Sequence, residues 1–171
     1  MPLTNPMFYA SAWQLVGNGA ATHDVFVLMN PVGSSKIMRV VWAELSQSTG
    51  GSAGNTGQGR LYRCTTPTGG TQDGIVRCDS NDTPTGVFYN QASSDGVASA
   101  ITAAGVGTMF IPCGVFQSGT NVANNGRQTQ DYRRLDFLML RAGEGILGRI
   151  YSPTAVSANS RVWGGIAWTE E

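Results

Sequence analysis

The chain has 171 residues, of which 41% are hydrophobic, and this suits one domain that folds around its own core. Only 13% of the residues are charged, and 11 basic residues balance 11 acidic ones, so the basic excess typical of a nucleic-acid partner is absent. No apolar run approaches the roughly 20 residues that a membrane helix needs. We therefore expect neither nucleic acid nor a membrane among the partners of this protein.

The positive charges are unevenly divided between the two basic residue types. Lys36 is the only lysine, beside ten arginines. Arginine is enriched and lysine depleted at protein interfaces, because the guanidinium is weakly hydrated and can bind a carboxylate with two donors. This composition indicates protein contacts, although a genome rich in G and C gives the same bias.

Residues 1–23 show little alternation of apolar and polar side chains, yet they are too apolar for a solvated tail. We interpret them as an extended N-terminal arm that packs either on a neighbouring subunit or on the edge of the chain's own sheet. Four large side chains of this arm are candidate assembly contacts: Met7, Phe8, Tyr9 and Trp13.

Short apolar runs bounded by turn residues continue from residue 24 to the end, and each is typical of a β-strand. The run at residues 36–47 is apolar on both faces, with Val41, Ala43 and Leu45 on one side and Met38, Val40 and Trp42 on the other, which predicts a central strand. The predicted strands are Asp24–Met29, Lys36–Gln47, Arg60–Thr65, Gly74–Asp79, Gly86–Asn90, Val106–Pro112, Leu135–Arg141, Ile146–Tyr151 and Arg161–Thr169.

One stretch, Gly96–Ala104, allows two turns of helix or an extended linker, and its sequence does not distinguish them. Regular short strands with turn signals and almost no helical period predict an all-β fold. We expect residues 24–171 to form a single two-sheet β-sandwich, with a jelly roll as the favoured version.

Two glycine- and acid-rich segments resemble ligand-binding loops. Gly143–Gly148 matches the spacing GxGxxG, but it opens no helix, so we interpret it as a hairpin turn rather than a dinucleotide site. Asp79–Asp82 resembles part of a calcium loop, but it lacks the later glycine and the bidentate glutamate, so an Asx turn is the better interpretation. We predict no cofactor and no metal site.

Three cysteines, Cys64, Cys78 and Cys113, have no CxxC spacing, and His23 is the only histidine. A zinc site would need all four to converge. Free thiols are the default in a reducing compartment, and the alternative is a disulfide between Cys64 and Cys78 that forms after the protein leaves the cell. His23 has no nucleophile marked by a GxSxG elbow, so we predict no enzyme.

One local basic cluster remains, and it is a further candidate for assembly contacts because arginine can grip a carboxylate of a neighbour. A solvated loop explains the same residues. The cluster consists of Arg127, Arg133 and Arg134.

Five segments, in this order, are similar to a pattern in small structural proteins of tailed bacteriophages and prophages, of the decoration or auxiliary type. The chain departs from that pattern in having Ala142 where the family has proline, and in Cys64 and Cys78. The segments are Arg60–Thr65, Thr68–Thr71, Asp79–Asp82, Leu140–Gly145 and Trp168–Glu171.

The resemblance implies a virion component with no catalytic residues to carry over. We expect a capsid decoration or cement protein, assembled in the host cytoplasm, as a homo-oligomer, most simply a trimer, that contacts the major capsid protein or other virion proteins. The alternative is a connector or receptor-binding module of the tail, neck or fibre, for which the polar loop at residues 48–59 is the motivation.

Overall fold

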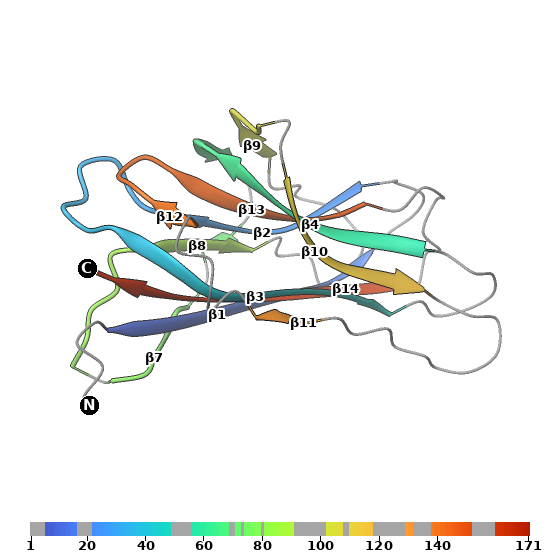
Figure 1. The fold of residues 1–171 in the computed structure, drawn as a ribbon, viewed down its shortest axis with the longest axis horizontal. Helices are drawn as coiled ribbons and strands as arrows, with labels where there is room; N and C mark the ends of the chain where they lie inside the picture. Colours follow the sequence, from blue (N-terminus) through green and yellow to red (C-terminus); the bar gives the residue numbers. More distant parts are fainter. Residues whose placement is uncertain are drawn as a thin grey trace.

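The computed structural model describes residues 6–16, 22–48, 56–68, 71–72, 74–79, 81–90, 102–107, 110–117, 129–131, 138–151 and 160–171. All regular structure in these residues is β-strand, and two antiparallel sheets pack face to face (Figure 1). The predicted all-β two-sheet sandwich is therefore confirmed.

Sheet A has the strand order β11-β3-β14-β1-β7, and β12 pairs with β3 on the same edge as β11. Its strands are β1 (Met7–Val16), β3 (Met38–Ser48), β7 (Val76–Arg77), β11 (Thr129–Asp131), β12 (Met139–Leu140) and β14 (Ser160–Glu170).

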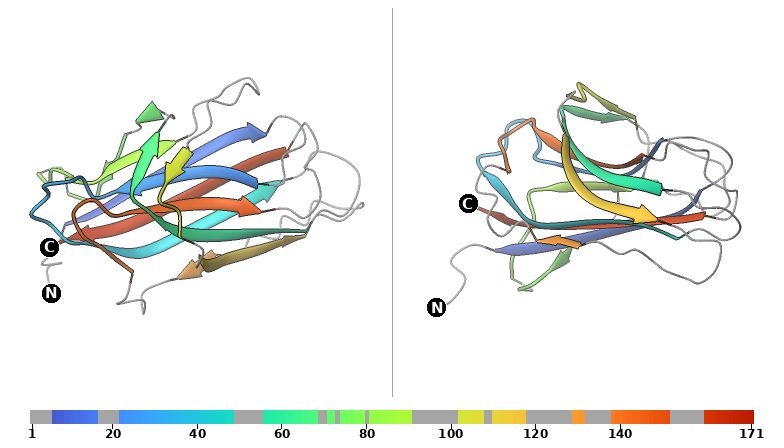
Figure 2. Two further views of the ribbon diagram at one scale, coloured as in Figure 1. Left: turned by 90° about the horizontal axis from the view of Figure 1, so that it is seen from above. Right: turned by 45° about the vertical axis from the view of Figure 1, so that its right-hand side comes forward.

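Sheet B has the strand order β10-β4-β13-β2-β8-β6. Its strands are β2 (Thr22–Met29), β4 (Thr56–Cys64), β6 (Thr71–Gln72), β8 (Val87–Asn90), β10 (Phe110–Gln117) and β13 (Gly145–Tyr151). A small separate sheet pairs β5 (Thr66–Thr68) with β9 (Thr102–Ala104) and lies between β4 and β10 in sequence (Figure 2).

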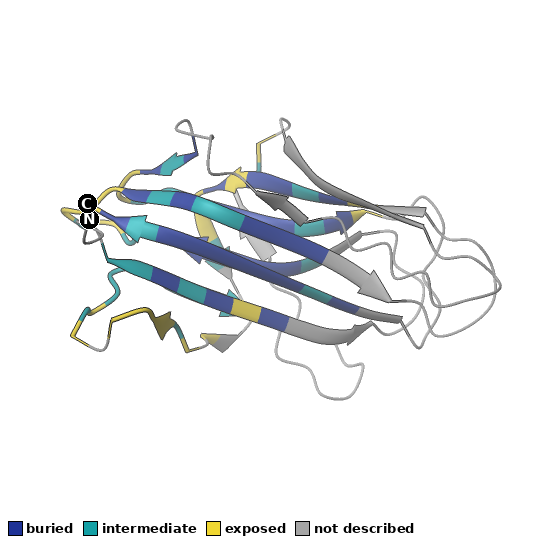
Figure 3. Cartoon of the chain, turned by 60° about the horizontal axis from the view of Figure 1, so that its bottom comes forward, coloured by how far each residue is buried: buried dark blue, intermediate teal, exposed yellow. Residues whose placement is uncertain are grey.

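Eight strands follow jelly-roll connectivity. The order β1-β14-β3-β11 in sheet A faces the order β2-β13-β4-β10 in sheet B, so the first and last strands of the chain are neighbours in one sheet. This is the arrangement expected of two interleaved Greek keys. Both termini consequently lie at one end of the sandwich (Figures 1 and 3).

The core fills the space between the sheets with one face of each long strand. In β1 the inward positions are Phe8, Ala10 and Ala12, and Phe8 is 0% exposed. Phe8 packs against Trp168 with ring centroids 5.8 Å apart, and Phe26 stacks on Phe88 across sheet B. At about 25 cal/mol per Å² of buried apolar surface, these rings are among the largest stabilising contributions.

The N-terminal segment belongs to this core. Strand β1 pairs with β14 from Met7 to Val16, and the boundary expected after residue 23 falls inside β2 of the same sandwich. Of the two placements predicted for residues 1–23, the described part takes the one on the chain's own sheet, near its edge beside the two-residue strand β7.

Strand β3 is central, as predicted, but its faces differ from strict alternation. The register with β14 shifts between Ala167 and Trp168, so Val41 is an extra residue that forms a β-bulge. As a result Met38 and Val40 share the inner face with Ala43 and Leu45, which the sequence pattern had placed opposite them.

The helix considered for residues 96–104 is not formed at its end, because 102–104 are strand β9. At residues 143–148 the chain turns, as predicted, but the turn is not a hairpin. Gly143, with φ of 81°, lies between β12, which pairs in sheet A, and β13, which pairs in sheet B. The Asx turn at residues 79–82 is also confirmed, since the Asn81 N–H donates to Asp79 Oδ1 at 2.9 Å.

A buried carboxylate joins the two sheets at the end near the termini. Glu170 at the end of β14 is 2% exposed, and its oxygens accept from Thr85 N–H, Gly86 N–H and Trp168 Nε1–H at 2.9 to 3.1 Å. These donors satisfy the charge without a cation, and they hold the segment before β8 of sheet B against β14 of sheet A.

Candidate functional site

The outer surface of sheet A carries aromatic side chains on its three long strands. The register places Tyr9 beside Ala167 and Ala167 beside Trp42. Four residues further along β1, it places Trp13 beside Trp163. No described element crosses this surface, which faces the reader in Figure 3. We call it the aromatic face, and its described side chains are Tyr9, Trp42, Trp163 and Ala167, the first three half-buried.

A missing side chain lets two of these rings meet. Tyr9 and Trp42 lie 5.8 Å apart between centroids at an interplanar angle of 38°, although β14 separates their strands. A Cβ on Gly165 would lie 2.8 Å from Tyr9 Oη and 3.1 Å from Trp42 Cζ3. The two rings therefore close over Gly165 and form a packed apolar surface rather than two separate exposed side chains.

The outer surface of sheet B is different, because its apolar half is a second core. Five buried side chains form this cluster, and Tyr89 and Val106 pack against it. Val106 follows β9, and the small β5–β9 sheet stands on this side of sheet B (Figure 1). The buried members are Val27, Met29, Tyr62, Cys64 and Leu147.

The other half of that surface holds a cluster of two arginines and two tyrosines. Arg60 of β4 lies opposite Arg149 of β13. Arg60 lies over the ring of Tyr151 at 4.7 Å, and Arg149 lies over the ring of Tyr62 at 5.4 Å, so each arginine stacks on the diagonal tyrosine of the other strand.

One carboxylate completes this arginine–tyrosine cluster. Arg149 binds Asp24 with two donors, its Nε to Oδ1 and its Nη2 to Oδ2 at 3.0 Å. The hydrogen bond with Asp24 raises the pKa of the Arg149 guanidinium, so this guanidinium keeps its charge. We interpret this cluster as a structural clamp between β2, β13 and β4.

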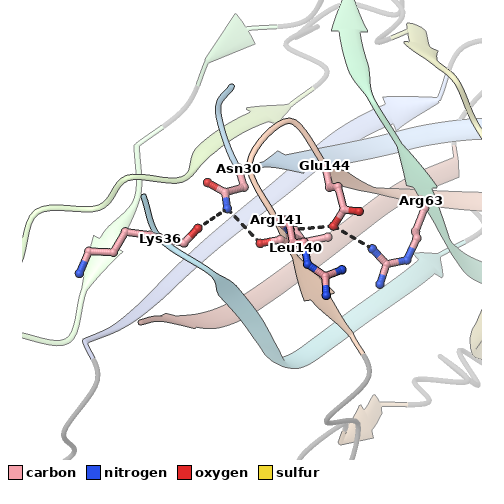
Figure 4. A network of polar contacts seen from close by, with 6 residues as sticks. All are labelled: Asn30, Lys36, Arg63, Leu140, Arg141 and Glu144. Atoms are coloured by element: carbon pink, nitrogen blue, oxygen red, sulfur yellow. Dashed lines mark hydrogen bonds and ion pairs between the residues drawn. The ribbon is translucent and has the colours of Figure 1, made fainter. Parts of the chain in front are cut away.

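A third surface is formed by two loops at the end near the termini (Figure 4). Asn30, directly after β2, is buried, and its Nδ2 donates to Lys36 O at 2.8 Å and Leu140 O at 2.9 Å. Its backbone N–H donates to Glu144 O, and Gly143 N–H donates to Asn30 O. One side chain and its backbone thus hold residues 31–37 against the turn at 141–144.

The turn at residues 141–144 is fixed from its other side as well. Glu144 Oε2 accepts from Arg141 N–H at 2.7 Å and from Arg63 Nη1 at 3.3 Å. At the tip of the neighbouring loop, Val32 is 89% exposed. We call residues 31–37 the valine loop. Val32 is exposed at its tip, while the hydrogen bonds of Asn30 fix the loop against the turn at residues 141–144.

The sequence-predicted assembly residues fall into different environments. Tyr9 lies on the aromatic face, Met7 is half-buried, and Trp13 occupies a position on the same face of β1 as Tyr9. Phe8 was predicted as an assembly contact, and this is wrong because its ring lies in the core between the sheets. The remaining candidates, Arg127, Arg133 and Arg134, lie outside the described residues.

The disulfide between Cys64 and Cys78, considered as the alternative to free thiols, is not formed in the structure. Both thiols are free, Cys64 buried and Cys78 exposed. Cys64 ends β4 in sheet B and Cys78 follows β7 in sheet A, so the two thiols lie on different sheets. Burial, and to a smaller extent the negative charge of Asp24, raises the pKa of the Cys64 thiol to about 12, so this thiol is unreactive at neutral pH.

Metal binding and membrane insertion were both considered from the sequence, and the part of the chain that the structure describes bears on each. No group of three or more His, Cys, Asp and Glu side chains there is placed to hold a metal ion. The described part of the chain also contains no helix that is long and apolar enough to span a membrane. The side chain of His23, in β2, lies outside the description.

Sequence reasoning missed the arginine–tyrosine cluster and the anchored valine loop. The cluster has a readable signal, because Arg60-Leu61-Tyr62 and Arg149-Ile150-Tyr151 repeat the pattern Arg-x-Tyr, which puts both residues on one face of a strand. The valine loop has a weaker signal in Asn30-Pro31, which indicates a turn but not what the asparagine holds.

Comparison with protein-family models gives no match to this chain, and neither do comparisons with curated proteins and with solved structures. A function for this chain therefore has to be inferred from its residues and their geometry.

Proposed function

We propose that this chain is a structural protein of a tailed-bacteriophage particle, and that it decorates the capsid shell as a cement protein. The observation that carries the proposal is the aromatic face, an open sheet surface on which Tyr9 and Trp42 pack together above Gly165. Three aromatic side chains half-buried on one sheet face offer the contact area that a partner protein can cover.

Two further features support the same proposal. The jelly roll is an architecture of viral capsid domains, although it also hosts other functions. The five segments that resemble phage structural proteins include Arg60–Thr65 and Leu140–Gly145, which lie on sheet B and in the turn bound by Asn30. The chain is proposed to act in the virion, with the major capsid protein or other virion proteins as partners.

A cement protein acts through area rather than through reacting groups. Each copy buries apolar surface against shell subunits, at about 25 cal/mol per Å² before the ordering costs of association are subtracted. Any protein that binds only the assembled shell shifts the equilibrium toward that shell by mass action. Many modest contacts therefore stabilise the particle, and the protein needs neither a cofactor nor an active site for this work.

The test is to purify particles of the phage or prophage that encodes the chain and to count its copies by quantitative gel densitometry. A shell-wide role predicts on the order of hundreds of copies, since a capsid contact repeats with the symmetry of the shell. A count of about a dozen or fewer, with a tagged copy seen at the tail or neck by electron microscopy, would replace decoration with the connector or receptor-binding role. Absence from purified particles would end the proposal altogether.

A further inference from the structure

Among the described large apolar side chains, two are far more exposed than the rest, Val32 at 89% and Val76 at 61%. Val32 belongs to the valine loop between β2 and β3, and Val76 belongs to β7. Both segments lie at the end of the sandwich where the two termini lie, the loop on one side of that end and β7 on the other (Figure 1).

The valine loop is flanked by positive charge. Lys36 lies at its far end, and Arg141 lies in the turn that Asn30 binds to it. Both side chains are exposed, and no ion pair joins either of them to another described residue. The neighbouring arginines differ, because Arg39 pairs with Glu171 and Arg63 pairs with Glu144.

The surroundings of Val76 have the opposite charge. Asp79 and Asp82 follow it in the Asx turn, where the Asp82 N–H also donates to Asp79 O. Strand β7 is fixed to β1 by register and by the Cys78 N–H, which donates to Met7 O at 3.1 Å. Arg77 is the one cation within this segment, and as the next residue on the strand it points to the opposite side from Val76. We call Val76, Asp79 and Asp82 the acidic patch.

We propose that the valine loop of one copy docks on the acidic patch of a second copy. Val32 covers Val76, while Lys36 and Arg141 face Asp79 and Asp82. Both surfaces are held by hydrogen bonds in the single chain, so little ordering cost is added on contact. The balanced charge of the chain, with 11 basic and 11 acidic residues, adds no overall repulsion between copies.

The two surfaces are different, so the contact is heterologous, and successive copies joined in this way form a closed ring when the rotation between them permits. Val76 lies opposite Tyr9 in the register, so this contact borders the aromatic face beside Tyr9 and leaves Trp42 and Trp163, on the strands beyond β1, available for another partner. The inference concerns the purified chain alone, so it holds or fails independently of any role in a virion.

The experiment measures the mass of the purified protein by light scattering over a range of concentrations. The wild type is expected to form oligomers. The double variant Lys36→Glu and Arg141→Glu, and separately Val32→Asp, should weaken association at least about tenfold, because like charges then face each other or a charge enters the apolar contact. Gln58→Glu, an exposed charge change on β4 at the end far from the turn at residues 141–144, is the matched control and should associate as the wild type does.

Mixing two variants, one altered in the acidic patch and one in the residues beside the valine loop, tests whether these two surfaces are the ones that meet. Asp82→Lys should be as defective alone as Lys36→Glu with Arg141→Glu, and the two variants together should associate again, since the intact loop of the first meets the intact patch of the second. A wild type that stays monomeric, or variants that associate like the wild type, would overturn the proposal, as would a mixture that fails to recover.

A covalent readout uses the exposed native thiol. In Val32→Cys, mild oxidation should link the new thiol to Cys78 of the next copy and give a ladder on a non-reducing gel, and Cys78→Ser in the same background should remove that ladder. Equal cross-linking with and without Cys78 would contradict the proposed pairing of the two surfaces.

Discussion

The two outer surfaces of the sandwich differ in how far their apolar side chains are buried. On sheet B the side chains of Val27, Tyr62 and Leu147 are buried in a second core that the chain covers itself. On sheet A the rings of Tyr9 and Trp42 pack against each other but stay half-buried, with no described element over them. The same fold thus covers one outer surface with its own residues and leaves the rings on the other half-buried, where a partner is proposed to bind.

Because of this difference, substitutions on the two surfaces are expected to change different quantities, the free energy of unfolding on one and partner binding on the other. A substitution on the sheet B surface removes contacts that the folded chain always makes, so it lowers the free energy of unfolding. A substitution on the aromatic face removes little from the isolated chain, and its main effect is expected on a partner. The contrast between the surfaces is lost if both respond to substitution in the same way.

Deleting Met1–Trp13 is expected to have the largest effect, the loss of the fold. The deletion removes Phe8, Ala10 and Ala12 from the core and leaves one edge of β14 without its partner. Domains of this size are stable by only about 5 to 15 kcal/mol, so they do not survive the loss of a core strand. Far-ultraviolet circular dichroism should show an unfolded chain. A truncated chain that keeps its sheet signal would instead make the N-terminal segment a detachable arm.

On the sheet B surface, Leu147→Ala should lower the free energy of unfolding by about 2 to 5 kcal/mol, because it opens a cavity in the second core. Urea unfolding followed by fluorescence measures the change. A loss below about 1 kcal/mol would mean that this surface is as loosely covered as the aromatic face, and the contrast between the two would be gone.

Cys64 gives a test by pH. Its pKa is raised to about 12 from an ordinary 9.0, so the folded state keeps the proton that the unfolded chain loses between these values. The neutral thiol therefore contributes fully below pH about 9, and stability falls by about 1.4 kcal/mol per pH unit above it. Between pH about 8 and 10, the free energy of unfolding of the wild type should therefore fall by about 1.4 kcal/mol more than that of Cys64→Ala.

Labelling at neutral pH checks the same contrast directly. A thiol reagent should modify Cys78 at once and Cys64 only after unfolding, with each site read by mass spectrometry. Rapid modification of Cys64 in the folded protein would show that the cover over the second core opens easily.

Trp42→Ala should have the smallest effect on the isolated chain, at most about 1.5 kcal/mol, since the ring is half-buried and packs against the ring of Tyr9. Its proposed effect lies in particle binding, which should weaken while circular dichroism stays unchanged. If unfolding is affected as strongly as by Leu147→Ala, the aromatic face is part of the chain's own core.

Much of the fold could be predicted because it depends on local pattern. Runs such as residues 24–29 and 146–151 read as strands, and turn residues such as Gly143 separate them. Strand β1 was predicted only as one of two placements of the N-terminal arm, because both of its faces are uncharged: Phe8 and Ala10 point inward, while Tyr9 and Ser11 point outward. Alternation is visible only when one face is polar.

The candidate surfaces depended on register, which the sequence alone does not contain. Tyr9, Trp42 and Ala167 are far apart in the chain and meet only because β1 and β3 flank β14. The bulge at Val41 reversed the faces of half a strand, and no local signal marks it. Asn30 was readable as the end of a strand, but its bonds to Lys36 O and Leu140 O required the packed loops.

The most direct test of the account is hydroxyl-radical footprinting of Tyr9 and Trp42, in the purified protein and in intact phage particles. The account predicts that both side chains are oxidised in the free protein and strongly protected in the particle, while Tyr151, which is 36% exposed on the other sheet, changes little. Equal oxidation of Tyr9 and Trp42 in the two samples would contradict the claim that the aromatic face is where this protein meets its partner.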